Sequence, residues 1–180
     1  MTRTGNASCV VISGCSGGGK STLVAELARR GFPIVDEPGR RVIAAQRAIG
    51  GSALPWLDME AFLIEALQLG LADRMDAAHT QRCTFFDRSL VDAASALTSL
   101  GKPVSENVQG WLHAYQRVVF FTPPWAEIYS VDADRRHSLD AAEIEYDRLR
   151  VDYPALGYTV EILPKAPVDV RADWLLARLA

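Results

Sequence analysis

A glycine-rich segment near the N-terminus carries the clearest chemical signal in this chain. It matches the pattern G-x-x-x-x-G-K-[ST] with the residues Gly14, Cys15, Ser16, Gly17, Gly18, Gly19, Lys20 and Ser21, and Thr22 follows. Glycines let consecutive backbone N–H groups turn inward and form a cradle for an anion. In this pattern the lysine reaches the β- and γ-phosphates of a nucleoside triphosphate, and the serine hydroxyl ligates Mg²⁺. The segment therefore predicts that ATP or another nucleoside triphosphate binds together with Mg²⁺.

The residues on either side of this segment predict the elements that position it. Cys9–Ile12 is a short apolar run, typical of a buried strand, that ends at Ser13. Apolar residues then recur at helical spacing from Leu23 to Ala28, and Gly31 ends the pattern. A strand, a loop and a helix N-terminus, whose backbone dipoles attract negative charge, form the arrangement that phosphate binding needs.

A second group of candidate residues follows a later apolar run. Cys83–Phe86 is typical of a buried strand and ends at Asp87. A carboxylate at that point suits a ligand to Mg²⁺ or to its bound waters. Because a helical pattern begins at Leu90, the alternative role of Asp87 is the N-cap of that helix, and the two roles are compatible. Arg88 can clamp phosphate or acceptor oxygens through paired N–H groups.

Strand-like and helix-like patterns alternate along the chain, which predicts an α/β fold with a parallel sheet covered by helices on both faces. The remaining predicted strands are Phe32–Asp36, Val118–Phe121 and Thr159–Leu163. The remaining predicted helices are Arg40–Ile49, a long helix from Met59 towards His79, Leu90–Leu100, Val104–Tyr115, a helix that starts at Asp140 with Glu143 and continues to Leu156, and a last helix from Val168 after Pro167. No repeat or linker divides the pattern, so we expect residues 1–180 to form one domain.

A polar stretch between the fourth and fifth predicted strands predicts a lid. Residues 130–138 include Arg135 and Arg136 and contain almost no apolar side chain. Such a segment can close over a bound triphosphate, where Arg135 can stabilise the charge that develops during phosphoryl transfer. The alternative interpretation is an ordinary solvated loop.

The composition is typical of a compact intracellular protein. Of the 180 residues, 49% are apolar and 23% are charged, which is enough to bury a core. The net charge of −3 gives no general affinity for polyanions, so we expect no nucleic-acid partner. Cys9, Cys15 and Cys83 lack metal-ligand spacing and predict reduced thiols, with Cys15 either open to oxidation or simply a tolerated loop residue. No segment is typical of a membrane span or signal peptide, so we expect a cytoplasmic protein that does not bind membranes.

Three short motifs resemble those of known kinase families. Glu37-Pro38-Gly39 and Asp87-Arg88-Ser89 are similar to the signatures that follow the second and third strands of thymidylate kinases and deoxynucleoside kinases. The overall likeness is greatest to a bacterial AAA-type ATPase-like family related to the ribosylnicotinamide kinase domain, with Asp134-Arg135 in the lid position. This resemblance implies the P-loop NTPase three-layer sandwich, with a five-stranded sheet in the order 2-3-1-4-5. Ligands of such open sheets bind at the carboxyl ends of the strands.

The resemblance also implies roles for individual residues. Glu37 corresponds to the carboxylate that accepts the proton of the acceptor hydroxyl, and a plain surface acid is the alternative. Lys165-Ala166-Pro167 occupies the position at which nucleotide kinases enclose the adenine. Thymidylate kinases place an arginine directly before the Glu-Pro pair, whereas this chain has Asp36. A phosphate contact from this region would have to come from Arg40 or Arg41 instead.

Together these residues predict an ATP- and Mg²⁺-dependent kinase that phosphorylates a nucleoside, a nucleotide or another small metabolite. The alternative is a non-kinase ATPase, or an ATP-sensing module, that regulates a partner protein. Release of ADP that depends on a small-molecule acceptor distinguishes the two. Acceptor pockets vary while a fold stays constant, so the sequence leaves the identity of the acceptor open.

Overall fold

A five-stranded parallel sheet forms the centre of the molecule, and its order is β2-β3-β1-β4-β5, as predicted. The computed structural model describes residues 9–80, 82–128 and 138–179. The strands are β1 (Cys9–Gly14), β2 (Ile34–Val35), β3 (Thr84–Asp87), β4 (Val118–Thr122) and β5 (Thr159–Ile162). The second strand is shorter than the predicted range Phe32–Asp36, and the others lie within a residue or two of their predicted ranges.

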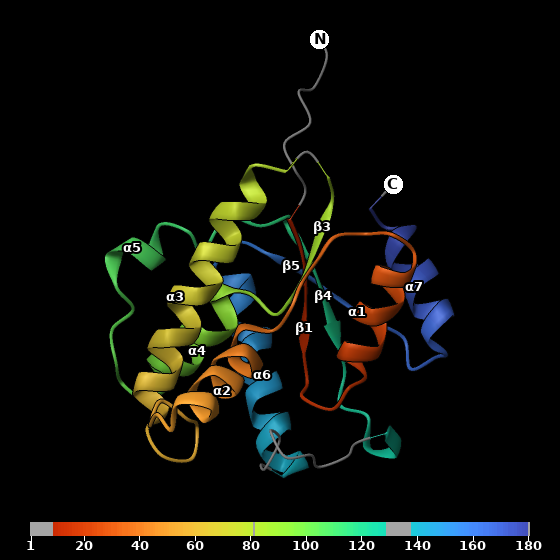
Figure 1. Cartoon of the computed structure of the whole chain (residues 1–180). Coiled ribbons are helices and arrows are strands. Elements are labelled where there is room, and N and C mark those ends of the chain that lie inside the picture. The colour runs from red at the N-terminus through yellow and green to blue at the C-terminus, as the bar shows by residue number, and fades with distance from the viewer. Residues whose placement is uncertain (1–8, 81, 129–137, 180) are drawn as a thin grey trace.

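Helices cover both faces of the sheet, which confirms the predicted three-layer arrangement (Figure 1). One face carries α1 (Lys20–Arg29) and α7 (Val168–Leu176). The other carries α3 (Met59–Ala78), α4 (Leu90–Ser99) and α6 (Leu139–Ala155), and α2 (Pro38–Ile49) packs on α3. The short helix α5 (Glu106–Gln109) and the 3₁₀ turn η1 (Ala126–Ile128) lie in connections.

Each face of the sheet buries its own apolar cluster because successive side chains of a strand point to opposite sides. Val10 and Ile12 of β1 pack with Leu23 of α1 and with Leu175 of α7. Val11, between them, belongs to the cluster formed with α3, α4 and α6. The central strand β1 is fully buried along its length, so the loop that follows it starts from a rigid base.

The predicted helix Val104–Tyr115 is wrong in its length. Only α5 is helical, and Gly110 follows its last residue, at the C-cap. Glycine is a poor helix former because its backbone loses the most freedom on ordering, so the helix ends there. The residues beyond the cap carry Trp111 and Tyr115 into the core of the α3–α4 face.

The start of α6 also differs from the prediction. Ser138, not Asp140, is the N-cap, and its hydroxyl accepts a hydrogen bond from the backbone N–H of Ala141. All but this last residue of the predicted lid 130–138 lies outside the described residues, Arg135 included. The lid and the role of Arg135 therefore stay predictions.

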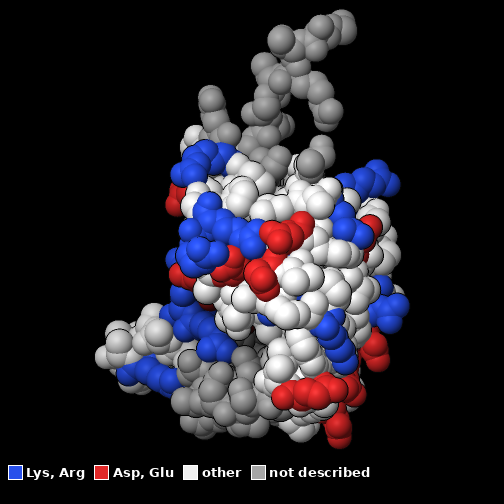
Figure 2. Space-filling view, turned by 90° about the vertical axis from the view of Figure 1, so that its right-hand side faces the viewer, with Lys and Arg blue, Asp and Glu red and all other residues white. Residues whose placement is uncertain are grey.

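Opposite charges alternate on the face that α1 and α7 cover (Figure 2). Glu26 of α1 pairs with Arg29 and with Arg30, the C-cap of this helix, and Arg30 also pairs with Asp173 of α7. These ion pairs join the two helices across the surface, where each contributes about 1 kcal/mol or less. Within the described ranges, no helix combines the length and the hydrophobicity that crossing a bilayer requires.

Candidate active site

The glycine-rich loop leaves β1 and lies against the end of β4. The backbone N–H of Cys15 donates to the carbonyl of Thr122 at 2.8 Å. Gly14 has a φ of 105°, and a Cβ at this position would lie 2.4 Å from the Thr122 carbonyl oxygen. A Cβ at Gly18 would lie 2.6 Å from the carbonyl oxygen of Pro123. Only glycine fits at these two positions, so the close approach of the two backbones fixes the shape of the loop.

Lys20 and Asp87 meet at the bottom of this loop. Lys20 is the first residue of α1, and its Nζ lies 3.8 Å from Asp87 Oδ1 at the end of β3. Lys20 is only 6% exposed, so its side chain lies largely buried beneath the loop. Burial raises the pKa of the Asp87 carboxyl, and the neighbouring Lys20 opposes this rise.

The alternative role of Asp87 as a helix N-cap is wrong. Ser89 caps α4, since its hydroxyl accepts from the N–H of Val91 and the Asp92 carboxylate accepts from the N–H of Ser89. Asp87 Oδ1 is buried and accepts no hydrogen bond from any described residue. A buried carboxylate oxygen without a donor costs free energy unless a cation or water satisfies it.

The residues at this point fit a hydrated Mg²⁺ ion bound with a nucleotide. Asp87 supplies an unsatisfied oxygen beside Lys20, and Lys20 lines the same cavity as the Ser21 hydroxyl. Among the described residues, no group of three or more acidic, histidine or cysteine side chains is arranged so that it could hold a metal ion by itself. Mg²⁺ usually takes only one or two protein ligands and keeps phosphate oxygens and waters for the rest, so this sparse set is the expected one.

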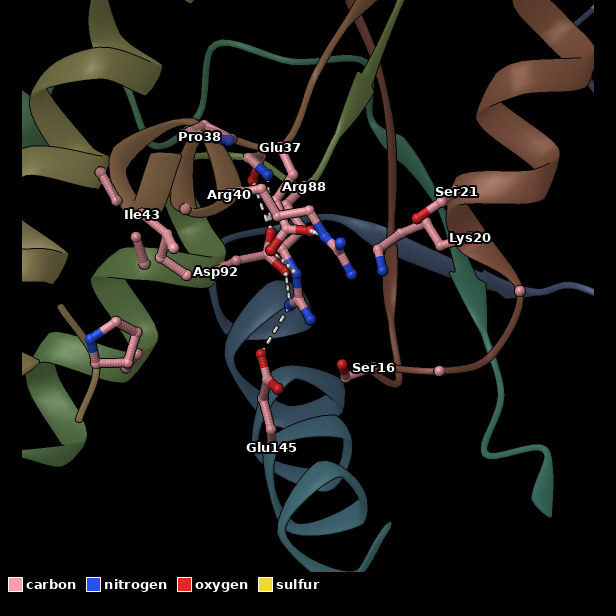
Figure 3. A pocket seen from close by; sticks show the side chains of 18 of the residues that line it. Ser16, Lys20, Ser21, Glu37, Pro38, Arg40, Ile43, Arg88, Asp92 and Glu145 are labelled. Carbon is pink, nitrogen blue, oxygen red and sulfur yellow. Dashed lines mark hydrogen bonds and ion pairs between the residues drawn. The ribbon is translucent and has the colours of Figure 1, made fainter. Parts of the chain in front are cut away.

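Arg88 is the centre of a network of carboxylates. Its Nη1 lies 2.7 Å from Glu145 Oε1 and 3.0 Å from Asp92 Oδ1, and its Nε lies 3.4 Å from Glu37 Oε1 (Figure 3). Burial lowers the pKa of Arg88, but the carboxylates outweigh burial and hold the pKa above its ordinary value. Arg88 has a φ of 69°, a strained backbone conformation for a residue with a side chain. The network therefore holds Arg88 in a conformation that its backbone alone would disfavour.

Glu37 lies between two arginines at the entrance to α2. Its Oε2 is 3.4 Å from Arg40 Nε, and its Oε1 faces Arg88. Figure 3 shows Lys20 pointing from α1 towards this group. Arg41, in contrast, pairs with Asp73 of α3 at 2.6 Å. Of the two arginines considered for acceptor binding, only Arg40 lines the cavity.

One cavity of about 1330 Å³ is lined by Lys20, Glu37, Arg88, Asp92 and Glu145, among others. Its middle is formed by the loop and the start of α1, including Ser16, Gly17, Gly19, Lys20, Ser21 and Thr22. One end reaches Lys165 and Pro167 after β5, and the other continues past Glu37 and Arg88 between α2, α3 and α4. Small-molecule pockets usually measure roughly 300–1,000 Å³, so this cavity has room for more than one ligand.

Arg171 connects the loop to the far end of the cavity. Its Nη1 donates to the carbonyl of Gly19 at 3.0 Å, and its guanidinium lies 5.6 Å from the centre of the Trp125 ring. Burial lowers the pKa of Arg171. Together with Lys165 and Pro167, this stacked pair gives the end of the cavity an aromatic and cationic wall, which suits the flat ring of a nucleobase.

Sequence reasoning missed Asp92 and Glu145. Asp92 lies three residues after Ser89, and the pattern S-x-x-D is a capping signal that points to this residue. The second oxygen of Asp92, Oδ2, accepts a hydrogen bond from the Tyr153 hydroxyl at 2.6 Å, which fixes the carboxylate on the side away from Arg88. Glu145 lies in α6, 57 positions from Arg88, and no local pattern distinguishes it from other helical acids.

Cys15 is protected rather than reactive. It is fully buried, and its thiol donates to the carbonyl of Ser16. Burial, with the negative charge of Glu145 adding to it, raises the pKa of this thiol to about 11. Since the thiolate is the reactive form, Cys15 is a packing residue of the loop, and oxidation of the folded protein at this position is disfavoured.

Comparison with known proteins agrees with this architecture. A family model described as an AAA domain matches residues 9–171. No curated protein matches the chain. Among solved structures, the NadR protein in complex with NR gives a TM-score of 0.63 at 18% identity over 97% of this chain and 51% of that one. Thymidylate kinase from Ehrlichia chaffeensis gives a TM-score of 0.57 at 14% identity over 97% of this chain and 100% of that one.

Deoxyadenosine kinase from M. mycoides, with bound dATP, gives a TM-score of 0.55 at 14% identity over 95% of this chain and 98% of that one. At such identities the likeness shows the fold alone, which is that of P-loop kinases. The family match covers nearly all of the chain, from the first described strand to the last helix. The chain therefore belongs to this AAA-domain family and has the P-loop kinase fold.

Proposed function

We propose that this protein is a kinase that transfers the γ-phosphoryl group of Mg²⁺-bound ATP to the hydroxyl of a small metabolite the size of a nucleoside. The observation that carries the proposal is the extent of the cavity. It continues from the glycine loop past Glu37 and Arg88 into a second chamber between α2, α3 and α4. A hydrolase needs room only for a water molecule beside the γ-phosphate, whereas this chamber has room for a second substrate.

The triphosphate half of the site contains groups suited to positioning and charge neutralisation, which are most of what phosphoryl transfer requires. The loop N–H groups and Lys20 bind the phosphates, and Arg171 with Trp125, Lys165 and Pro167 receives the base. Mg²⁺, held by Ser21 and by Asp87 directly or through water, neutralises phosphate charge when bound. One neighbour was solved with bound dATP, which supports a purine nucleoside triphosphate as a ligand of this fold.

The acceptor half contains the general base, the group that takes the proton of the acceptor hydroxyl. Glu37 is held at 3.4 Å from both Arg40 and Arg88, so its carboxylate has a fixed direction beside the expected γ-phosphate. The acceptor oxygen forms a bond to the γ-phosphorus, and its proton passes to Glu37. The bond from the γ-phosphorus to the bridging oxygen breaks, and ADP leaves with that electron pair.

The test is acceptor-dependent release of ADP in the native protein and in Glu37→Gln. A panel of nucleosides, nucleotides and simple alcohols should contain a compound that accelerates ADP release. Glu37→Gln should lower this acceleration by about 10² or more, the usual contribution of a general base, with ATP affinity nearly unchanged. Glu60→Gln is the control, since Glu60 pairs with Lys102 outside the cavity. If no compound accelerates ADP release and a protein partner does so instead, the protein is an ATPase switch.

A further inference from the structure

The second chamber of the cavity differs in character from the phosphate half. We call it the acceptor chamber and define it by Ile43 of α2, Trp56, Met59, Phe62 and Leu63 of α3 and its preceding loop, and Ala96 of α4. All six side chains are apolar or aromatic. The guanidinium of Arg47 lies 5.2 Å from the centre of the Trp56 ring, outside the lining, and holds this ring in place.

The polar side chains at the wall of the chamber are bonded to the protein. Arg148 Nε donates to Ser95 Oγ at 2.8 Å, and Arg148 Nη1 donates to Ser99 Oγ at 3.4 Å. The Ser99 hydroxyl donates to the carbonyl of Ala96 at 2.7 Å. Because these polar groups already have partners, a nucleobase bound against this wall has its own hydrogen-bond donors and acceptors left unpaired, which costs binding free energy.

The charge at the entrance of the chamber is unfavourable for an anion. Arg88, the obvious cation there, already faces the carboxylates of Glu37, Asp92 and Glu145. Arg40 faces Glu37 as well. The third cation, Arg148, is bonded to Ser95 and Ser99. A phosphate or carboxylate on the acceptor therefore finds cations that already have partners, and it lies close to the three fixed carboxylates, which disfavour it.

From these observations, and resting on the proposed kinase function, we infer that the acceptor is an uncharged alcohol with a ring-sized, predominantly hydrocarbon body. The body fills the acceptor chamber, and the hydroxyl lies at the Glu37 end, where the phosphoryl group arrives. Nucleoside monophosphates and hydroxy acids bind more weakly because the cations at the entrance are already paired with carboxylates, and nucleosides bind more weakly because their base edges find no partner.

Binding is measured by calorimetry in the presence of Mg²⁺ and a non-hydrolysable ATP analogue. The probes are 2-naphthylmethanol, its 6-carboxylate, thymidine and thymidine monophosphate. We expect 2-naphthylmethanol to bind at least about tenfold more tightly than each of the other three, because a like-charge contact or an unpaired polar edge each costs about this factor or more. Equal or tighter binding of thymidine or thymidine monophosphate, or no binding of 2-naphthylmethanol, overturns the inference.

Two matched pairs of variants locate the binding. Ala96→Phe fills the chamber and should weaken 2-naphthylmethanol about tenfold or more, whereas Thr98→Phe, on an exposed position of α4 outside the lining, should not. Met59→Lys should tighten binding of the carboxylated probe, whereas Ile64→Lys, equally 40% exposed on α3 but outside the lining, should not. The Met59 pair stays informative if Ala96→Phe fails to fold, because the position is at the surface. Unchanged binding in Met59→Lys overturns the placement.

Phosphoryl transfer is scored separately from binding. If 2-naphthylmethanol binds as described but is never phosphorylated, the kinase proposal fails and the chemistry of the chamber stands. If thymidine monophosphate is bound and phosphorylated, the kinase proposal stands and this inference fails.

Discussion

The ammonium of Lys20 lies 3.8 Å from the carboxylate of Asp87, and the two side chains are 6% and 8% exposed. The pair joins the start of α1 to the end of β3, below the glycine loop. The carboxylate oxygen nearest the lysine accepts no hydrogen bond from a described residue. The site thus combines a buried cation for the phosphates with a carboxylate oxygen that has capacity left for an ion or a water.

Asp87→Asn should raise the Mg²⁺ concentration that half-maximal activity requires by about tenfold or more, because a neutral amide is a poorer ligand for a hard cation. The measurement is a Mg²⁺ titration of ADP formation at saturating ATP. Asp76→Asn, on an exposed position near the end of α3, is the control. An unchanged titration would remove Asp87 from the metal site.

The same substitution should change how stability depends on pH. The pKa of Asp87 in the folded protein is raised above its ordinary value of 3.8, so above pH 3.8 the folded state binds more protons than the unfolded state. The free energy of unfolding therefore falls as the pH rises through the raised pKa. Urea unfolding between about pH 4 and 8 should show this fall in the native protein and a smaller one in Asp87→Asn. Parallel pH profiles would contradict the direction of the shift.

Lys20→Ala should weaken ATP binding by about tenfold or more and abolish turnover, because no other described side chain places an ammonium under the loop. The substitution also leaves Asp87 buried without its cation, so thermal unfolding is recorded alongside binding. Lys102→Ala, at an exposed residue paired with Glu60, is the matched control. Normal ATP affinity in Lys20→Ala would argue against the site.

Arg88→Ala should destabilise the folded protein by about 3 kcal/mol, because it leaves the carboxylates of Asp92 and Glu145 without their shared cation. Glu145→Gln alone should cost less, since Arg88 keeps its other partners. The double variant should then lose less stability than the sum of the two single variants. Urea unfolding of the four proteins measures this coupling, and strict additivity would show that the contact between Arg88 and Glu145 contributes nothing.

Much of the fold could be predicted from the sequence because its signals are local. The glycine pattern between a short apolar run and a helical repeat identified the loop. Periodicity located the strands, and family resemblance predicted their order, which the sheet confirms. Helical periodicity did not predict helix ends that depend on a single residue, such as the end of α5 at Gly110. Similarly, the N-cap of α6 is Ser138, whereas the sequence predicted a start at Asp140.

The relationships within the candidate site depended on tertiary structure. Arg88 and Glu145 are 57 positions apart, and only the packing of α6 beside α4 brings them within 2.7 Å. The apolar acceptor chamber likewise has no sequence pattern of its own. Its lining comes from α2, α3, α4 and the loop before α3, and Met59, Phe62 and Leu63 fall at the helical spacing that equally predicts a core-facing surface. Hydrophobic periodicity identifies an apolar face of a helix. Only the relative placement of the three helices decides whether a neighbouring helix packs on that face or a cavity remains beside it.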